Sequence, residues 1–261
     1  MARSVGSGLV KMRRRAHNAR HKLNRDYQWE RPHRRILAAV TEDHGYTVQA
    51  GPFMGMHYDP GFPTDQALVP RLLGYYEAEL HPIVHQAIAK GYDRIIDIGS
   101  SEGYYAVGFA RRLPEAQVFA FDIDEEMQAR CRQMTELNGV KDRVHIRGLC
   151  DHSALEEHVT ERSLIISDCE GGEMNLLDPS QAPSLLKADL IVEVHDHIVP
   201  GISEEMIARF QPTHDIGIVA SMLQDPRRFE CLQSLSSKTQ RLAVDERRPV
   251  PMEWMVMTRR L

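Results

Sequence analysis

Acidic and imidazole side chains gather where two neighbouring apolar runs end in the second half of the chain. Asp168 and Glu170 follow the first run directly, and Glu193 and His195 close the second. Both runs are typical of buried parallel strands, whose carboxyl ends meet at one edge of a sheet. Alternation along a strand also places Glu193 and His195 on the same face. We therefore expect Asp168, Glu193 and His195 to converge.

Two kinds of positive group would neutralise this cluster. The chain has no Lys or Arg from Asp168 to Leu185, and neighbouring carboxylates in a partly dry cleft cannot all stay ionised without a counter-charge. One solution is a divalent cation held by Asp168, Glu193 and His195. Carboxylate oxygens suit Mg²⁺ and an added imidazole favours Mn²⁺, Fe²⁺ or Zn²⁺, so Mg²⁺ or Mn²⁺ is expected. The other solution is an amine or guanidinium of the substrate, and the sequence leaves both open.

Three of these side chains are candidates for catalysis, namely His195, Asp168 and Glu170. Imidazole titrates near neutral pH, so His195 suits either a general base or a metal ligand. Glu170, which two glycines follow, is also typical of a cap on the next helix. His197 fits a solvated loop histidine, and Cys169 has no basic neighbour in the sequence that would activate its thiol.

A turn of small residues between two further apolar runs indicates a nucleoside site. The first run, residues 95–98, contains Asp97, and the second run ends in Asp122; between them come Gly99, Ser100, Ser101 and Gly103, and then a helix that starts at Tyr104. The glycine spacing departs from the G-x-G-x-x-G of dinucleotide sites. Asp97 would repel a pyrophosphate but can reach an ammonium group through water, and Asp122 can accept both ribose hydroxyls. This pair of acids predicts S-adenosylmethionine rather than NAD.

The same stretch resembles motif I of the class I S-adenosylmethionine-dependent methyltransferases, D/E-x-G-x-G-x-G, with Ser101 in place of the middle glycine. Residues 168–173 and 193–195 resemble the D-x-E-G-x-E and E-x-H segments of the FkbM-like methyltransferases, and residues 74–77 resemble their G-x-Y-E. The likeness extends from Gly51 to the C-terminus. It implies methyl transfer, often O-methylation of small molecules and sugars. It also implies further cofactor contacts from Tyr76, Glu77, Ile123, Cys150 and Asp151.

Composition sets the broad class. The chain has 261 residues, of which 42% are hydrophobic and 26% charged, values typical of a globular protein with one sizeable core. No apolar run approaches the about 18 residues of a membrane-spanning helix, and no secretory signal is visible. The four cysteines form no C-x-x-C pair, which favours free thiols in a reducing cytoplasm. We expect a cytoplasmic protein without a membrane partner.

The charge is unevenly distributed along the chain. Residues 1–35 hold 11 of the 32 Lys and Arg but 2 of the 37 Asp and Glu. Such a basic arm can hold RNA, an anionic substrate or an acidic partner surface, or it can pack on its own acidic domain. We expect this arm, mobile or packed, to precede a cap region at 36–90 and a cofactor-binding methyltransferase domain at 91–261.

The pattern of apolar runs predicts an α/β fold. Strands are expected at residues 95–98, 118–121, 144–146, 163–167, 188–194, 214–220 and 252–257. Helical spacing marks residues 27–40, 66–90 with a break at Pro82, 125–138 and 204–210. We expect a Rossmann-like, seven-stranded, doubly wound sheet with a helical N-terminal cap, in which the seventh strand runs antiparallel.

The expected function is methyl transfer to a small-molecule acceptor, most simply a hydroxyl, with metal assistance. Three alternatives stay open: N-methylation of a small molecule, methylation of a nucleic acid held by the basic arm, and a non-catalytic protein that binds S-adenosylmethionine. Neither an N-P-P-Y tetrapeptide nor a Pro-Cys nucleophile is present, which disfavours the nucleic-acid reading. A homo-oligomer is compatible with the sequence.

Overall fold

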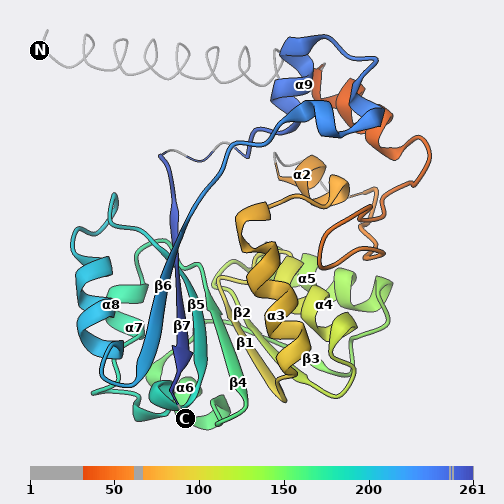
Figure 1. The fold of residues 1–261 in the computed structure, drawn as a ribbon. Coiled ribbons are helices and arrows are strands. Elements are labelled where there is room, and N and C mark those ends of the chain that lie inside the picture. The colour runs from red at the N-terminus through yellow and green to blue at the C-terminus, as the bar shows by residue number, and fades with distance from the viewer. Residues whose placement is uncertain (1–31, 62–66, 247, 249, 261) are drawn as a thin grey trace, which may run out of the picture. The chain divides into compact units, whose positions relative to one another are not determined.

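The computed structural model describes residues 32–61, 67–246, 248 and 250–260. Its centre is a seven-stranded sheet with the strand order β3-β2-β1-β4-β5-β7-β6 (Figure 1). The strands are β1 Arg94–Ile98, β2 Gln117–Phe121, β3 Val144–Arg147, β4 Ser163–Ser167, β5 Asp189–Val194, β6 His214–Ala220 and β7 Glu253–Arg259. β7 pairs antiparallel with β5 and β6, whereas β1 to β5 pair in parallel. This arrangement confirms the predicted Rossmann-like sheet and its antiparallel seventh strand.

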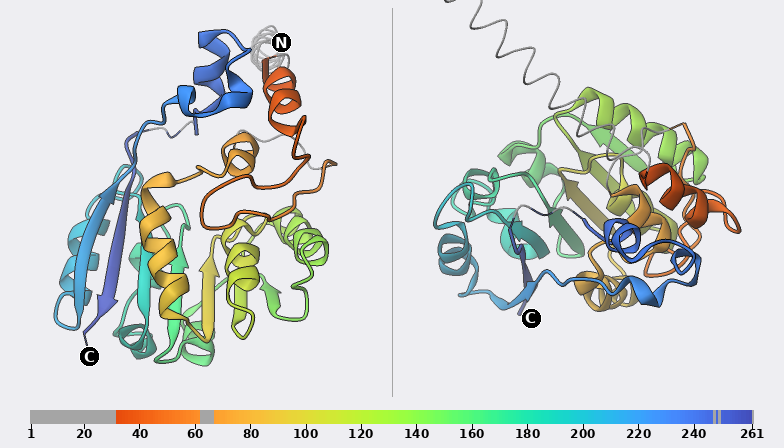
Figure 2. Two further views of the ribbon diagram at one scale, coloured as in Figure 1. Left: turned by 45° about the vertical axis from the view of Figure 1, so that its right-hand side comes forward. Right: turned by 90° about the horizontal axis from the view of Figure 1, so that it is seen from above.

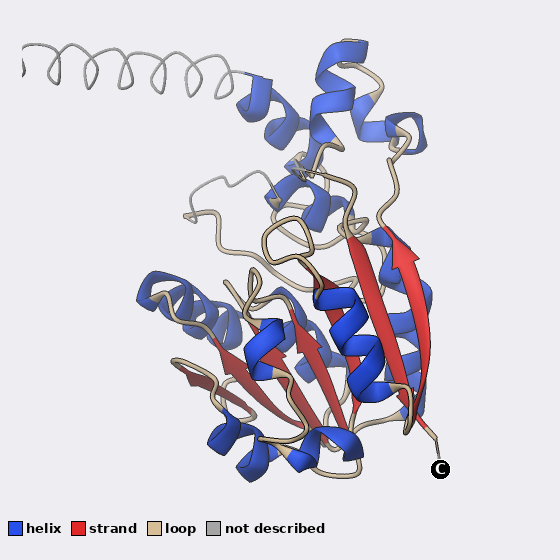
Figure 3. Cartoon of the chain, turned by 90° about the vertical axis from the view of Figure 1, so that its left-hand side faces the viewer, coloured by secondary structure: helices blue, strands red, loops and turns tan. Residues whose placement is uncertain are grey.

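Helices cover both faces of the sheet (Figures 2 and 3). The labelled α-helices are α2 Leu68–Leu73, α3 His81–Lys90, α4 Tyr104–Arg112, α5 Glu125–Leu137, α6 His152–His158, α7 Glu173–Leu176, α8 Ile202–Phe210 and α9 Ser237–Ala243. Short 3₁₀ turns are η1 Ala78–Leu80, η2 Pro183–Lys187, η3 Pro226–Arg228 and η4 Glu230–Leu232. Every residue of β4 and β5 is buried, as expected for central strands packed on both sides.

The register of the central strands sets the candidate residues side by side. Ser167 at the end of β4 pairs with Val192 of β5, so the next residues, Asp168 and Glu193, leave the sheet as neighbours. On the other side of β4, Ile98 of β1 pairs with Ser167. The carboxyl ends of β1, β4 and β5 therefore meet at one edge of the sheet, as the sequence predicts.

The segment before β1 forms two α-helices, but the break does not lie at Pro82. α2 ends because Gly74 adopts a left-handed conformation with φ 74°, and its N–H bonds to carbonyl oxygens of the last helical turn. Pro82 stands in the first turn of α3, where a missing N–H leaves no intrahelical bond unmade. The sequence analysis also missed α6, which Asp151 caps by accepting the Ala154 N–H at 2.8 Å.

The described residues divide into two compact units. The smaller unit combines residues 32–45, where 32–41 are helical, with residues 225–244, which include α9. Only residues 225–244 of this unit lie in the chain between β6 and β7, and the larger unit holds the sheet and every candidate site residue. The predicted boundaries at residues 35 and 90 stay predictions, and residues 1–31 of the basic arm lie outside the described residues. Within the described chain, no helix is both long and apolar enough to cross a membrane.

Candidate functional site

A cavity of about 680 Å³ lies at the carboxyl ends of β1, β2 and β4. Nearly all of the predicted cofactor-binding residues line it, namely Tyr76, Glu77, Asp97, Gly99, Ser100, Ser101, Tyr104, Asp122, Ile123, Cys150 and Asp151. Two predicted catalytic residues, Asp168 and Glu170, line the same cavity. Segments far apart in the sequence thus form one chamber that is large enough for a nucleoside with an extended side chain.

The two glycines of the turn are required by the packing of the chain itself. A Cβ on Gly99, which has φ 80°, would lie 1.7 Å from the Asp168 carbonyl oxygen. A Cβ on Gly103, with φ 96°, would lie 2.7 Å from the Cys131 sulfur on α5. Gly103 is not among the residues that line the cavity. These glycines therefore let β1 meet the end of β4 and let α4 meet α5, and Gly99 lines the cavity as well.

Two side chains on the cavity wall each have a buried polar atom that lacks a hydrogen-bond partner. Asp97 is only 3% exposed, and its Oδ2 atom has none; the same holds for the hydroxyl of Ser100, which is 5% exposed. Burial, together with nearby carboxylates such as Asp168, raises the pKa of Asp97 to about 8. A buried polar atom without a partner costs free energy. Both atoms are therefore suited to a polar ligand, and Asp97 to one with a positive charge.

Asp122 organises the turn as well as facing the cavity. One carboxylate oxygen accepts the Ser101 N–H at 2.7 Å, and the other accepts the Asp124 N–H at 2.8 Å. A carboxylate has about four acceptor positions, so these two bonds orient Asp122 and still leave capacity for ribose hydroxyls.

Backbone strain is concentrated at the same cavity. Among the described residues, the non-glycine residues with positive φ are Glu77 (48°), Ser101 (48°) and Glu170 (54°). All three line the cavity. Such left-handed conformations cost free energy for side-chain-bearing residues and cluster at functional sites. Strain at three separate segments that meet in one chamber marks this chamber as the functional site.

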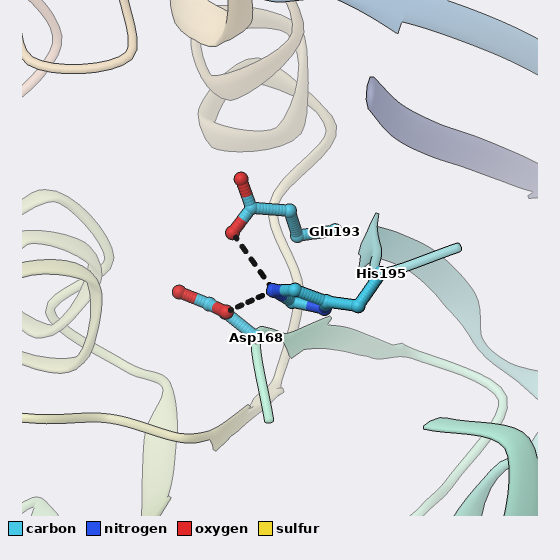
Figure 4. Close-up of side chains that lie close together, drawn as sticks. All are labelled: Asp168, Glu193 and His195. Carbon is cyan, nitrogen blue, oxygen red and sulfur yellow. Dashed lines mark ion pairs between the residues drawn. The ribbon is translucent and has the colours of Figure 1, made fainter. Parts of the chain in front are cut away.

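Asp168, Glu193 and His195 converge beside the cavity, as their spacing predicted (Figure 4). The Nε2 atom of His195 lies 3.5 Å from Asp168 Oδ1 and 3.8 Å from Glu193 Oε2 (Figure 4). Glu170 Oε2 lies 3.6 Å from the same nitrogen. One ligand atom from each of the three residues falls within 4.8 Å of the others, a spacing that a small inward movement would bring to the geometry of a bound cation.

A fully buried carboxylate holds the other side of the His195 ring. Glu173 Oε1 lies 3.1 Å from His195 Nδ1 and also accepts the Cys169 N–H at 3.0 Å. When Nδ1–H donates to Glu173, the lone pair of Nε2 faces Asp168 and Glu193. Metal-bound histidines as a rule donate their second ring N–H to a carboxylate, a backbone carbonyl or water. The sequence analysis placed Glu173 only in the first turn of a helix and missed this contact.

A smaller cavity of about 210 Å³ adjoins this cluster. It shares Tyr76, Glu77, Asp168 and Glu170 with the larger cavity and adds Glu193, His195, His197, Glu246, Arg248 and Met252. The two cavities therefore lie side by side and share a wall.

Arg248 supplies a positive charge that the sequence analysis missed. Its Nη2 atom lies 2.7 Å from Glu79 and 2.9 Å from Glu246, and its Nη1 atom lies 3.8 Å from Glu193. The argument that the acidic cluster lacks a protein counter-charge was based on residues 168–185 and is corrected by this contact. The predicted seventh strand could have revealed this contact. When that strand pairs antiparallel with β5, the residues that precede it, Glu246 and Arg248, come close to the end of β5.

Sequence comparison finds methyltransferases over part of the chain. The ribosomal protein L11 methyltransferase of Acinetobacter baumannii is 32% identical over 114 residues, which are 44% of this chain and 35% of that protein. The match thus spans about a third of the length of the curated relatives. No family model matches the chain, so membership of the FkbM-like family stays a prediction.

Solved structures similar to the chain include two O-methyltransferases. A putative one from Klebsiella pneumoniae has a TM-score of 0.46 at 16% identity, covering 88% of this chain and 90% of that chain. The other, from Bacillus cereus in complex with SAH, has a TM-score of 0.46 at 15% identity, covering 87% and 90%. An rRNA methylase from Streptococcus thermophilus has a TM-score of 0.45 at 16% identity, covering 70% and 97%.

Proposed function

We propose that this protein transfers a methyl group from S-adenosylmethionine to a small-molecule acceptor, most simply to a hydroxyl. The observation that carries the proposal is the pair of acids in one cavity. Asp97, buried with an unpartnered oxygen, lies on β1, and Asp122 directly follows β2. The first suits the ammonium group of the cofactor and the second suits its ribose.

The remaining walls of the cavity fit the other parts of the cofactor. Ile123 and Leu149 are apolar, line the cavity, and are 78% and 75% exposed. An adenine ring placed between them would cover apolar surface that now faces water. Asp168 and Glu170, on the wall towards the smaller cavity, are acidic and suit the positively charged sulfonium.

Methyl transfer needs mainly alignment of the acceptor with the activated methyl group. An acceptor in the smaller cavity would lie next to the wall that both cavities share, so its nucleophilic atom can face the sulfonium. In the site without a metal, His195 can take the proton from a hydroxyl, because Glu173 fixes the ring and directs Nε2 towards Asp168 and Glu193. With a cation bound at Nε2, His195 would be a ligand and not the base.

We also propose that Asp168, Glu193 and His195 hold a divalent cation, Mg²⁺ or Mn²⁺. The mixed oxygen and nitrogen donors and the Glu173 contact to Nδ1 support it. Such a cation would lower the pKa of the acceptor hydroxyl. The protein side chains would hold it, orient the acceptor and leave His195 fixed in one tautomer.

Charge in the smaller cavity favours a small acceptor over a nucleic acid. Among the described residues that line it, five carry carboxylates, namely Glu77, Asp168, Glu170, Glu193 and Glu246, and one, Arg248, carries a guanidinium. A polyanion would be repelled by this wall, whereas an amine-bearing acceptor would be attracted. N-methylation of a small molecule is therefore the second candidate.

Binding and turnover together test the proposal. Calorimetry should show that the full chain binds S-adenosylmethionine and not NAD, and that Asp97→Asn weakens this binding. Asp215→Asn is the matched control, since Asp215 lies on β6 and pairs with Arg260 away from the cavity. A metabolite extract incubated with methyl-labelled cofactor should then yield a labelled small molecule. Preference for NAD, or no binding of either cofactor, would contradict the proposal.

A further inference from the structure

Arg71, at the end of α2, contributes a guanidinium to the wall of the larger cavity. Among the described residues that line this cavity it is the only Lys or Arg, whereas six lining residues carry carboxylates. The sequence analysis did not select it, because nothing in the local pattern of α2 shows that this helix reaches the nucleoside site. Its position makes it the one strong cation on the described wall of the cofactor chamber.

The neighbours of Arg71 hold its guanidinium in place. Nη1 forms an ion pair with Glu102, whose side chain is only 4% exposed. Glu102 is itself fixed, because it accepts the Ser101 hydroxyl at 2.9 Å and the Tyr58 hydroxyl at 3.3 Å. The guanidinium carbon also lies 4.6 Å from the centre of the Tyr76 ring, a cation–π distance. A side chain held in this way loses little conformational entropy when a ligand binds.

Stability alone does not account for a cation at this place. Removing an ion pair of this kind from water costs about as much as the attraction returns, so an apolar pair would hold the fold equally well. A rigid guanidinium that faces a ligand chamber is instead the usual device for binding a carboxylate, because its planar set of N–H donors matches the two oxygens.

The methionyl end of S-adenosylmethionine carries an ammonium and a carboxylate on the same carbon atom. Its binding therefore needs an anion and a cation on one wall. Asp97 provides the anion, and Glu102, the ion-pair partner of Arg71, is near enough to contribute to the raised pKa of Asp97. Arg71 and Asp97 line the same cavity, and Glu102 interacts with each of them.

We propose that Arg71 binds the methionyl carboxylate of the cofactor and makes the site selective for adenosine ligands with a complete amino-acid tail. This inference rests on the proposed use of S-adenosylmethionine. Glu102 orients the guanidinium through Nη1, and Tyr76 supports its face. S-adenosylmethionine and S-adenosylhomocysteine carry the carboxylate, whereas 5′-methylthioadenosine has the same nucleoside and a thioether but no amino-acid tail.

Calorimetry with two ligands tests this role directly. We expect Arg71→Met to weaken S-adenosylhomocysteine binding about 10- to 100-fold, the effect of losing a hydrogen bond to a charged group. Binding of 5′-methylthioadenosine should change less than about twofold, since no charged contact is lost. Arg71→Lys should recover part of the difference, because it restores the charge without the planar set of donors.

The double variant Arg71→Met/Glu102→Gln covers the case in which the single variant folds poorly. It removes both charges, so no buried carboxylate is left unpaired, and the same loss of discrimination between the two ligands is expected. Equal losses for both ligands would overturn the inference, because they would show that Arg71 only shapes the cavity. Unchanged S-adenosylhomocysteine binding would overturn it as well. If the wild-type chain binds neither S-adenosylhomocysteine nor S-adenosylmethionine, the proposed function itself fails. That result differs from one in which the wild type binds these ligands and the Arg71 variants bind them equally well.

Discussion

Asp97 makes the stability of the ligand-free protein depend on pH in a direction that can be derived from its burial. An aspartate in an unfolded chain titrates near pH 4, whereas burial and the surrounding carboxylates raise the pKa of Asp97 to about 8 in the folded protein. Between these values the folded state binds more protons than the unfolded state. The contribution of Asp97 to the free energy of unfolding therefore falls as the pH rises from about 4 to about 8.

The Asp97→Asn variant isolates this contribution, because an amide has nearly the same shape and does not ionise. A shift of one pKa unit corresponds to about 1.4 kcal/mol, so the shift at Asp97 corresponds to roughly 5 kcal/mol. Near pH 4 the two proteins should have similar free energies of unfolding. Above pH 8 the variant should be more stable than the wild type by a difference of this order, even though it binds the cofactor less well.

Urea denaturation at a series of pH values measures the difference directly. Calorimetry in two buffers of different ionisation enthalpy gives a second readout. Cofactor binding near pH 7 should release up to one proton from the wild type, because the ammonium group favours ionised Asp97, and none from the variant. Parallel stability curves for the two proteins across this pH range would refute the assignment of a raised pKa to Asp97.

Three further predictions concern the metal, the ribose and the turn. A chelator should abolish turnover but leave cofactor binding intact, and added Mg²⁺ or Mn²⁺ should restore turnover. Glu173→Gln should lower the metal affinity about 10- to 100-fold. Full activity after verified metal removal would exclude the metal. Asp122→Ala should weaken cofactor binding by about 1.5–3 kcal/mol in calorimetry, and unchanged affinity in the folded variant would remove the ribose assignment. Gly99→Ala should lower the free energy of unfolding by more than about 2 kcal/mol, because the new Cβ would clash with the Asp168 carbonyl oxygen. Gly217→Ala is the control and should have a small effect, because a Cβ at Gly217 meets no atom within 4 Å.

The elements that were predicted well from the sequence are those whose start and end are marked by neighbouring residues in the chain. β4 coincides with the predicted strand 163–167, because its apolar run has turn residues on both sides. α5 begins at the Asp124 cap and ends before the Asn138-Gly139 pair, which stop the helix in the sequence as in the structure. The doubly wound sheet was also predicted correctly, because strand-like apolar runs that alternate with helical spacing favour a parallel sheet with helices on both faces.

The parts of the site that sequence did not predict depend on contacts between distant segments. Arg71 comes from α2 and Arg248 from the chain before β7. Arg71 is distant in sequence from Glu102, and Arg248 is distant in sequence from Glu193. Asp151 illustrates a second reason why sequence prediction was incomplete, because one side chain can both line the site and cap a helix. The residue lines the cavity as predicted, yet its carboxylate caps α6, a helix that the periodicity did not reveal.

The position of β7 between β5 and β6 determines the order in which the sheet can be completed during synthesis. Among the described strands, β6 pairs only with β7, and residues 225–244 of the smaller unit are synthesised between the two strands. After residues 214–220 leave the ribosome, β6 therefore stays unpaired until residues 253–259 follow. The edge of β5 that later binds β7 stays unpaired for the same time. Exposed strand edges are sites of wrong pairing and of chaperone binding. A ribosomal pause between the synthesis of β6 and that of β7 would therefore leave both edges exposed at once, and a nascent chain of this protein is open to misassembly during this interval.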